Sequence, residues 1–196
     1  MANDTSDRII DCAQALMVER GYNAFSYADI AETVKVTKAT IHFHFATKAV
    51  LAEQVVKRYR ESAVANLQYL SGQVPGAMAR LDAYVNYWKG CISDSKPLCL
   101  CALLAAEMLT LPDQLKNEVQ AFFRSVESWL ADTLGGGARQ GELCLTRSAE
   151  LEAKSLFAVV YGAMLAARVF GDADAFGAVT GDAIACLKAE TAVPGH

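Results

Sequence analysis

Apolar residues recur along this chain at spacings of three and four, which is the period of an α-helix, and no stretch shows the strict alternation of a half-buried strand. The sequence therefore predicts an all-α fold. The apolar pattern predicts helices over about 6–20, 27–34, 38–45, 48–70, 77–94, 98–110, 113–134, 148–170 and 172–189.

Turn-forming residues divide this pattern. The run Ser71 to Gly76 contains two glycines and a proline and predicts a linker, and the run Gly135 to Gly137 predicts a flexible loop. We therefore expect a helix-turn-helix domain over 1–48, a bridging helix over 48–70 and a second helical domain over 77–190.

Capping residues stand at the ends of the short N-terminal helices. Ser26 precedes the second helix with Asp29 three residues later, which is a capping-box arrangement. Thr37 and Thr47 precede the next two helices, and Gly21 suits a left-handed stop after the first. These signals predict three closely spaced helices followed by the long bridging helix.

The third of these helices has a polar and aromatic outer face. At about 100° per residue, Ile41 and Phe45 share one face and can pack on the first two helices. Two short helices joined by a tight turn are typical of a helix-turn-helix, in which cations and hydroxyls reach bases and phosphates while a small residue allows close approach. The outward side chains are Lys38, Ala39, Thr40, His42, Phe43 and His44.

The segment 25–48 resembles the DNA-binding signature of the TetR family of repressors. Phe25 to Ala31, Val36 to Phe45 and Thr47-Lys48 follow the family's order: a hydroxyl residue opens helix two, Ile-Ala follows, then Val-Ser-Lys-Gly-x-Leu-Tyr-x-His/Tyr-Phe, then a Lys that opens helix four. The resemblance covers about residues 6–60. The rest of the chain matches the family in length and helix count.

The resemblance implies a set of DNA contacts. Lys38, Ala39 and Thr40 would lie at the edge of the major groove. Ala39 replaces the usual Gly, and His42 and Phe43 replace the commoner Tyr, so hydroxyl contacts from those two positions are missing. The residues expected on the phosphate backbone are Ser26, Tyr27, Thr37, His42, His44 and Lys48, and we expect Lys48→Ala to weaken binding to all DNA and flatten its salt dependence.

The resemblance also implies how the protein works. We expect a homodimer that binds a palindromic operator near its own gene, represses transcription and is released by a small-molecule effector. The family dimerises through its last two helices, and the segment 148–170 suits this because it is apolar on more than one face and rich in small residues. The alternative is a buried helix in a monomer.

Aromatic and apolar residues of the middle helices are the expected lining of the effector pocket. Glu107 is one charge inside the apolar run 98–111, and it either hydrogen-bonds within the bundle or faces a polar group of the ligand. The expected pocket residues are Tyr84, Tyr87, Trp88, Cys99, Leu103, Glu107, Phe123, Trp129 and Tyr161.

A thiol mechanism is an alternative to the small-molecule effector. The run Leu98 to Glu107 resembles a segment of one branch of the family in which some members sense electrophiles or oxidants through the cysteine at the Cys99 position. In the first turn of a helix, the helix dipole would lower the pKa of the Cys99 thiol. The competing interpretation is a cysteine that only packs.

Composition narrows the remaining function classes. The net charge is −4, but residues 1–61, called the head below, hold as many cations as anions. The acidity therefore belongs to the rest of the chain, and the head can still bind phosphates. No glycine-rich phosphate loop, nucleophile elbow or metal-spaced cluster occurs, and we expect no enzyme, metal or cofactor.

The polar start and the short, interrupted apolar run 98–111 predict a cytoplasmic chain without a membrane partner. A helical interaction protein that does not bind DNA is the alternative, but it leaves the outer face of residues 38–44 unexplained.

Overall fold

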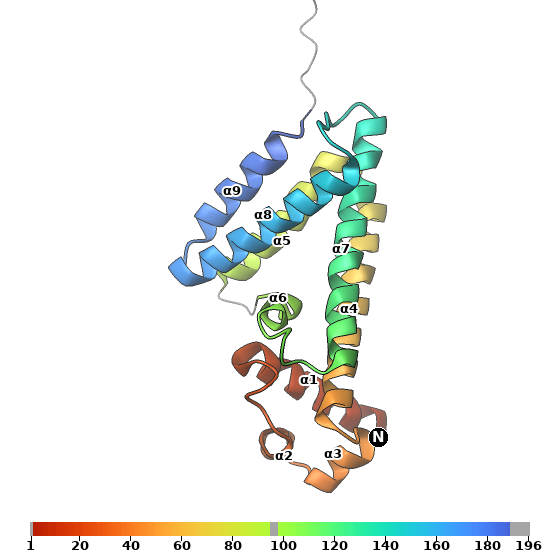
Figure 1. Cartoon of the computed structure of the whole chain (residues 1–196), viewed down its shortest axis with the longest axis vertical. Coiled ribbons are helices and arrows are strands. Elements are labelled where there is room, and N and C mark those ends of the chain that lie inside the picture. The colour runs from red at the N-terminus through yellow and green to blue at the C-terminus, as the bar shows by residue number, and fades with distance from the viewer. Residues whose placement is uncertain (1, 95–97, 189–196) are drawn as a thin grey trace, which may run out of the picture. The chain divides into compact units, whose positions relative to one another are not determined.

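The computed structural model describes residues 2–94 and 98–188. In those ranges its regular structure is helical, apart from one isolated antiparallel bridge between Leu143 and Lys188. The expected all-α fold is confirmed. The helices, labelled in Figure 1, are α1 (Ala2–Arg20), α2 (Tyr27–Val34), α3 (Lys38–His44), α4 (Lys48–Gln73), α5 (Ala77–Ser93), α6 (Leu100–Ala105), α7 (Asp113–Arg139), α8 (Ala149–Phe170) and α9 (Ala173–Ala185).

The chain forms two compact units. The first comprises residues 1–63 and 97–123, and so contains α1, α2, α3 and α6 with the beginnings of α4 and α7. The second comprises residues 64–96 and 124–196, and contains α5, α8 and α9 with the remainders of α4 and α7.

The first unit closes around one apolar core. Ile30 of α2 and Ile41 of α3 have no exposed surface, and α1 and α6 pack against each other within the same unit. Burying a large aliphatic side chain stabilises a fold by about 1.5–3 kcal/mol. The other completely buried side chains of this core include Ile9, Ala13, Met17, Leu51 and Val55.

The second unit is a bundle in which α5, α8 and α9 lie side by side (Figure 1). Their inward side chains include Leu81, Val160, Met164, Phe176 and Ile184, all buried. At the start of α5, Gly76 offers no side-chain cap, and the Glu142 carboxylate accepts hydrogen bonds from the backbone N–H of Ala77 at 2.6 Å and of Met78 at 2.8 Å. A carboxylate at a helix N-terminus satisfies free N–H groups and compensates the helix dipole.

Several predicted boundaries are wrong. α1 begins at Ala2 rather than near residue 6, with the carboxylate of Asp4 in its first turn, where the dipole favours a negative charge. α4 continues through the predicted linker to Gln73, because Trp129 Nε1 donates to Ser71 Oγ at 2.8 Å and ties this turn to α7. α6 ends at Ala105 and α9 at Ala185, both earlier than expected, and position 189 lies outside the described residues.

The glycine run Gly135 to Gly137 is helical, whereas the sequence suggested a flexible loop. α7 passes through it to Arg139. A Cβ atom on Gly137 would lie 2.5 Å from Cβ of Ala77 and 2.7 Å from Cδ1 of Leu143, whereas one on Gly136 would find its nearest neighbour at 4.0 Å. The helix therefore needs glycine at position 137 for close packing and not for flexibility.

This difference separates two neighbouring substitutions. We expect Gly137→Ala to lower the free energy of unfolding by about 1–3 kcal/mol, because the added methyl overpacks the contact. Gly136→Ala, the matched control, is expected to be neutral or to stabilise by up to about 1 kcal/mol through better helix propensity. Urea unfolding followed by circular dichroism measures both, and equal stabilities for the two variants would contradict the packing role of Gly137.

Candidate nucleic-acid interface

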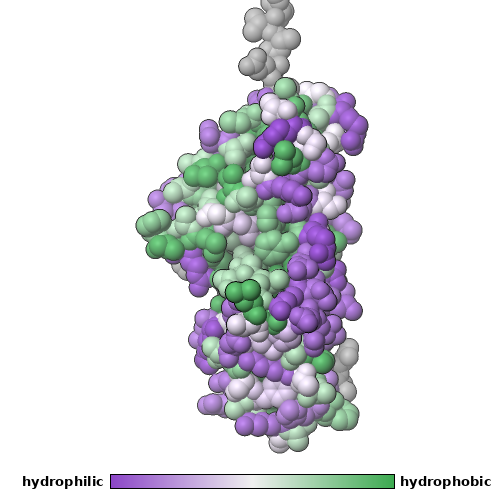
Figure 2. Space-filling model, in the orientation of Figure 1, coloured by the Kyte–Doolittle hydropathy of each residue, from purple (hydrophilic) through white to green (hydrophobic). Residues whose placement is uncertain are grey.

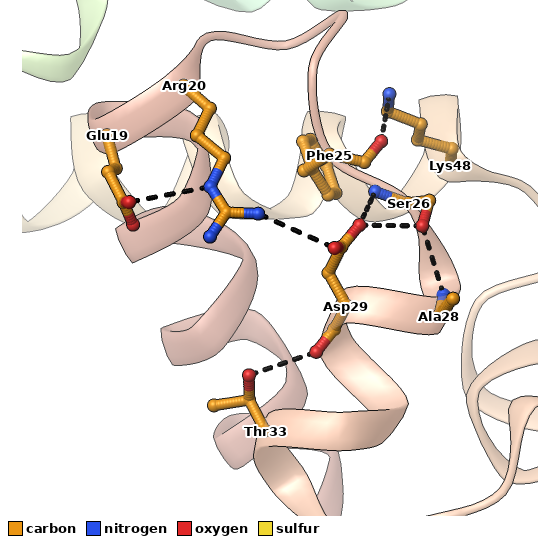
Figure 3. A network of polar contacts seen from close by, with 8 residues as sticks. All are labelled: Glu19, Arg20, Phe25, Ser26, Ala28, Asp29, Thr33 and Lys48. Carbon is orange, nitrogen blue, oxygen red and sulfur yellow. Dashed lines mark hydrogen bonds and ion pairs between the residues drawn. The ribbon is translucent and has the colours of Figure 1, made fainter.

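The start of α2 is fixed by a capping box. Ser26 N–H and its hydroxyl donate to Asp29 Oδ2 at 2.7 and 2.6 Å, and Ala28 N–H donates to Ser26 Oγ at 3.2 Å (Figure 3). The hydrogen bonds from Ser26 hold the pKa of Asp29 below its usual value, and Arg20 adds an ion pair at 3.5 Å. The predicted cap is confirmed, and the Ser26 side chain lies on the exposed surface where α2 begins.

The turn between α2 and α3 is tight. Lys35 adopts the left-handed conformation, with φ of 61°, and ends α2. Thr37 then caps α3: its hydroxyl oxygen accepts from Thr40 N–H at 3.0 Å and lies 2.9 Å from Thr40 Oγ1. These local bonds fix the direction in which α3 leaves the turn.

α3 divides into two faces, as its periodicity predicted. Ile41 and, just after the helix, Phe45 are buried against the core of the first unit. Lys38, Ala39 and Phe43 are exposed, and the Phe43 side chain keeps 84% of its surface accessible. This exposed surface combines a cation, a small residue and an aromatic ring on one short helix.

The two histidines flank that surface. His42 is exposed, its Nδ1 lies 3.2 Å from the Ala46 carbonyl oxygen, and its ring centroid lies 4.8 Å from that of Tyr27. His44 is half-buried, with its ring centroid 5.3 Å from that of Phe43. Both rings therefore have packing partners within the head.

Two predicted contact residues point their polar atoms inward. Tyr27 is buried, and its hydroxyl donates to the Phe45 carbonyl oxygen at 2.9 Å; burial raises the pKa of Tyr27 to about 12. Lys48 Nζ donates to the Phe25 carbonyl oxygen at 2.6 Å (Figure 3). It also lies 4.7 and 4.3 Å from the ring centroids of Tyr22 and Phe25. Burial lowers the pKa of this ammonium group. Both side chains join separate segments of the head.

Comparison with known proteins identifies this arrangement. Residues 77–181, more than half of the chain, match the family model described as "Tetracyclin repressor-like, C-terminal domain", and residues 9–55 match "Bacterial regulatory proteins, tetR family". The chain belongs to the TetR family of transcriptional regulators. Family membership confirms the resemblance seen in residues 25–48 and places the chain among DNA-binding regulators rather than enzymes.

Individual proteins resemble this chain in fold or in sequence. A TetR-family transcriptional regulator from Agrobacterium tumefaciens is 42% identical, with a TM-score of 0.93 over 96% of this chain and all of that one. The reduced form of E. coli NemR shares only the fold, with a TM-score of 0.86 at 18% identity over 96% of this chain and 100% of that one. The negative regulator of the biofilm operon icaADBC in Staphylococcus aureus, IcaR, is 43% identical over 51 residues, which are 26% of this chain. That match spans about a quarter of IcaR, 27% of its length.

The predicted effector residues of this TetR-family chain fall in both compact units. In the second unit Tyr84, Trp88 and Tyr161 are buried, Trp129 is half-buried with its ring centroid 5.5 Å from that of Tyr84, and Tyr87 is 63% exposed. Four predicted residues belong to the first unit. They are Cys99, which is buried, and Leu103, Glu107 and Phe123, which are half-buried.

Cys99 occupies a different position from the one expected. It is the N-cap of α6 rather than a residue of its first turn, and it is completely buried. Its thiol and that of Cys101 lie beside the Tyr59 hydroxyl, and burial raises the pKa of both Cys101 and Tyr59. Burial thus disfavours the charged forms of these two neighbours of Cys99.

Glu107 was predicted either to hydrogen-bond within the bundle or to face a ligand, and its hydrogen bonds in fact go to the link between α1 and α2. Its carboxylate accepts the backbone N–H groups of Tyr22 and Asn23 at 3.1 and 3.3 Å, and the Asn23 side-chain amide at 2.9 Å. Sequence reasoning did not find Asn23 or Thr110, which also accepts from that amide at 2.9 Å. No local signal links residues more than 80 positions apart, so only the fold could reveal this cluster.

The buried hydroxyl of Tyr27 gives a test of the head. Because its folded pKa of about 12 is above the ordinary tyrosine value of about 10, protonation of this group contributes stability that is complete below pH 10 and is lost as the pH rises through 12. Tyr27→Phe is expected to lower the free energy of unfolding at pH 8 by about 1 kcal/mol, since the Phe45 carbonyl loses its donor. The variant should also lose less of its free energy of unfolding between pH 10 and 12 than the wild type, because residue 27 no longer ionises.

Urea unfolding at pH 8, 10 and 12 checks this expectation, with Tyr69→Phe as the control because Tyr69 is exposed. A Tyr27→Phe protein as stable as the Tyr69→Phe protein at pH 8, with the same alkaline slope, would show that the bond to Phe45 contributes nothing.

Proposed function

We propose that this chain is a ligand-responsive repressor that binds a palindromic operator as a homodimer and is released by a small-molecule effector. The exposed polar and aromatic face of α3 carries the proposal. Ile41 and Phe45 are buried and fix α3 against the core. Lys38, Ala39 and Phe43 are exposed on the opposite side of this fixed helix. A preorganised helix of this kind suits the major groove.

The proposed contacts divide into three groups. Lys38, Ala39 and Thr40 read base edges, and Phe43 packs on the sugar or on a thymine methyl. Tyr27 and Lys48 position the head, because their polar atoms already bond within it. The residues proposed to flank the phosphates are Ser26, Thr37, His42 and His44.

An unpartnered donor supports a bound effector in the second unit. Trp88 is buried, and its indole N–H has no acceptor among the residues that the structure describes. Buried donors are nearly always satisfied by protein, water or ligand. A molecule with an acceptor atom, bound among the aromatic side chains of α5 and α7, would complete this hydrogen bond. We propose that such binding moves α4 and changes the separation of the two recognition helices from the roughly 34–36 Å of one DNA turn.

The apolar surface of α8 and α9 supports the homodimer. Green, hydrophobic atoms gather over these helices on the face shown in Figure 2. Val169 and Phe170 are 77% and 79% exposed, and a small cavity of about 130 Å³ lies between the helices, lined by alanines and by Phe170, Asp172, Phe176 and Val179. α8 is also long and apolar enough to cross a membrane. Its inner face, however, packs on α5 and α9 as in a bundle, and a second copy covers the remaining apolar face in our proposal.

The DNA-binding proposal predicts the behaviour of Lys38. Lys38→Ala should weaken binding to an operator selected from random duplexes, since a base-edge contact is lost, and reduce the slope of log affinity against log salt by about one, since the groove also loses a cation that displaces a counterion from the DNA. Lys57→Ala, an exposed cation of α4, is the control and should leave the slope unchanged. Fluorescence anisotropy over a salt series measures both. A wild-type protein that binds no duplex would favour a helical interaction protein instead.

The dimer proposal predicts a change of mass. Val169→Glu should convert a species of twice 21.1 kDa into one of 21.1 kDa, because a carboxylate in the seam would be desolvated without a partner. Tyr69→Glu, at an exposed aromatic residue of α4, should stay dimeric. Light scattering after size exclusion decides between them, and an unchanged mass for the Val169→Glu protein would remove α8 from the interface.

A further inference from the structure

Glu107 holds the link between α1 and α2, although it stands outside the proposed DNA contacts. It lies in the turns that follow α6, and its two carboxylate oxygens accept from Tyr22 N–H, Asn23 N–H and Asn23 Nδ2 at 3.1, 3.3 and 2.9 Å. Three donors on one carboxylate make a strong, charge-assisted contact between segments that are 84 and 85 positions apart. All of these atoms belong to the first compact unit.

The backbone of the link is shaped to admit this carboxylate. Gly21 has a φ of +80°, and a Cβ atom there would lie 2.2 Å from Glu107 Oε1. Both its conformation and its lack of a side chain are therefore needed where the carboxylate approaches. Thr110 adds a second tie, since its hydroxyl accepts from Asn23 Nδ2 at 2.9 Å and donates to the Glu107 carbonyl oxygen at 3.0 Å.

The same link leads directly into the DNA-reading helices. Phe25 accepts from Lys48, the first residue of α4, and Ser26 is the N-cap of α2. The Tyr22 ring lies under the Lys48 ammonium group at 4.7 Å. A displacement of the link therefore displaces the starting points of both α2 and α4, which flank α3.

We propose that Glu107 is a positioning residue for operator binding. By holding the α1–α2 link against the turn after α6, it fixes the starts of α2 and α4 and so the orientation of α3. The proposal rests on the DNA-binding function proposed above, and it assigns to Glu107 a role through the backbone of residues 22 and 23 rather than a contact with DNA.

The test compares two carboxylates that each accept two backbone N–H groups. Glu107→Ala should weaken operator binding about tenfold, in the range of typical coupling between sites. Its salt slope should equal that of the wild type, because no phosphate contact is lost. Glu142→Ala removes the analogous contact with Ala77 and Met78 in the second unit, and it should lower the melting temperature with operator affinity unchanged.

Hydrogen exchange reports the contact itself. In the Glu107→Ala protein the amide protons of Tyr22 and Asn23 should exchange faster, while that of Gly21, which donates to the Met17 carbonyl at 3.0 Å, stays protected. Glu107→Gln keeps an acceptor oxygen for Tyr22 and should recover part of the affinity. Asn23→Ala removes only the side-chain bonds and should show a smaller loss in the same direction, which keeps the test open if Glu107→Ala does not fold.

Two results would overturn the inference. One is wild-type operator affinity in a folded Glu107→Ala protein whose Tyr22 and Asn23 amides have lost protection. The other, if Glu107→Ala does not fold, is wild-type affinity in Asn23→Ala. Failure of the wild type to select any duplex would instead overturn the DNA-binding proposal, so the two failures are distinguishable.

Discussion

The proposed recognition surface lies on helices that are too short to be stable on their own. α2 has eight residues and α3 has seven, whereas isolated helices shorter than about 12–15 residues are marginal in water. Their stability must come from caps and from packing. Ser26 with Asp29 and Thr37 with Thr40 satisfy the first N–H groups, and Ile30 and Ile41 anchor the two helices in the core. The helix-turn-helix therefore exists only as part of the first unit.

This dependence explains the chemistry of the outer face. Because Ile41 and the caps already fix α3, the exposed side chains of Lys38, Ala39 and Phe43 lie outside the core that holds the helix. The Phe43 side chain is 84% exposed and therefore contributes little to the core, which agrees with the proposal that DNA covers it. The net charge of −4 does not oppose this interpretation, since the head is neutral and a few cations facing one way are enough to attract phosphates.

The two units use the same device to fix a chain segment. In the first, Glu107 accepts backbone N–H groups beside Gly21; in the second, Glu142 does so beside Gly76. Both glycines have positive φ, and a side chain at either would meet the carboxylate. In both places a carboxylate from a residue distant in the sequence satisfies the N–H groups that the glycine, which has no side chain, cannot cap. Such a contact is stronger than a neutral hydrogen bond, and it ties a local turn to a distant part of the chain.

Local sequence determined the features that depend on local bonds. The helical period, the caps at Ser26, Thr37 and Thr47, and the division of α3 into two faces all follow from residues within a few positions of one another. The family signature in residues 25–48 follows from the same short stretch. These could be predicted because the atoms that satisfy each other are neighbours in the sequence.

Tertiary structure alone decided the features that depend on distant atoms. The Phe25 carbonyl, 23 positions away, sets the inward direction of Lys48. The backbone N–H groups of Tyr22 and Asn23 determine where the Glu107 carboxylate binds. The helical state of Gly137 is set by close packing on Ala77 and Leu143, not by its own low helix propensity. In each case a buried or partly buried polar or small group is placed by a partner from another element. No local pattern encodes that partner.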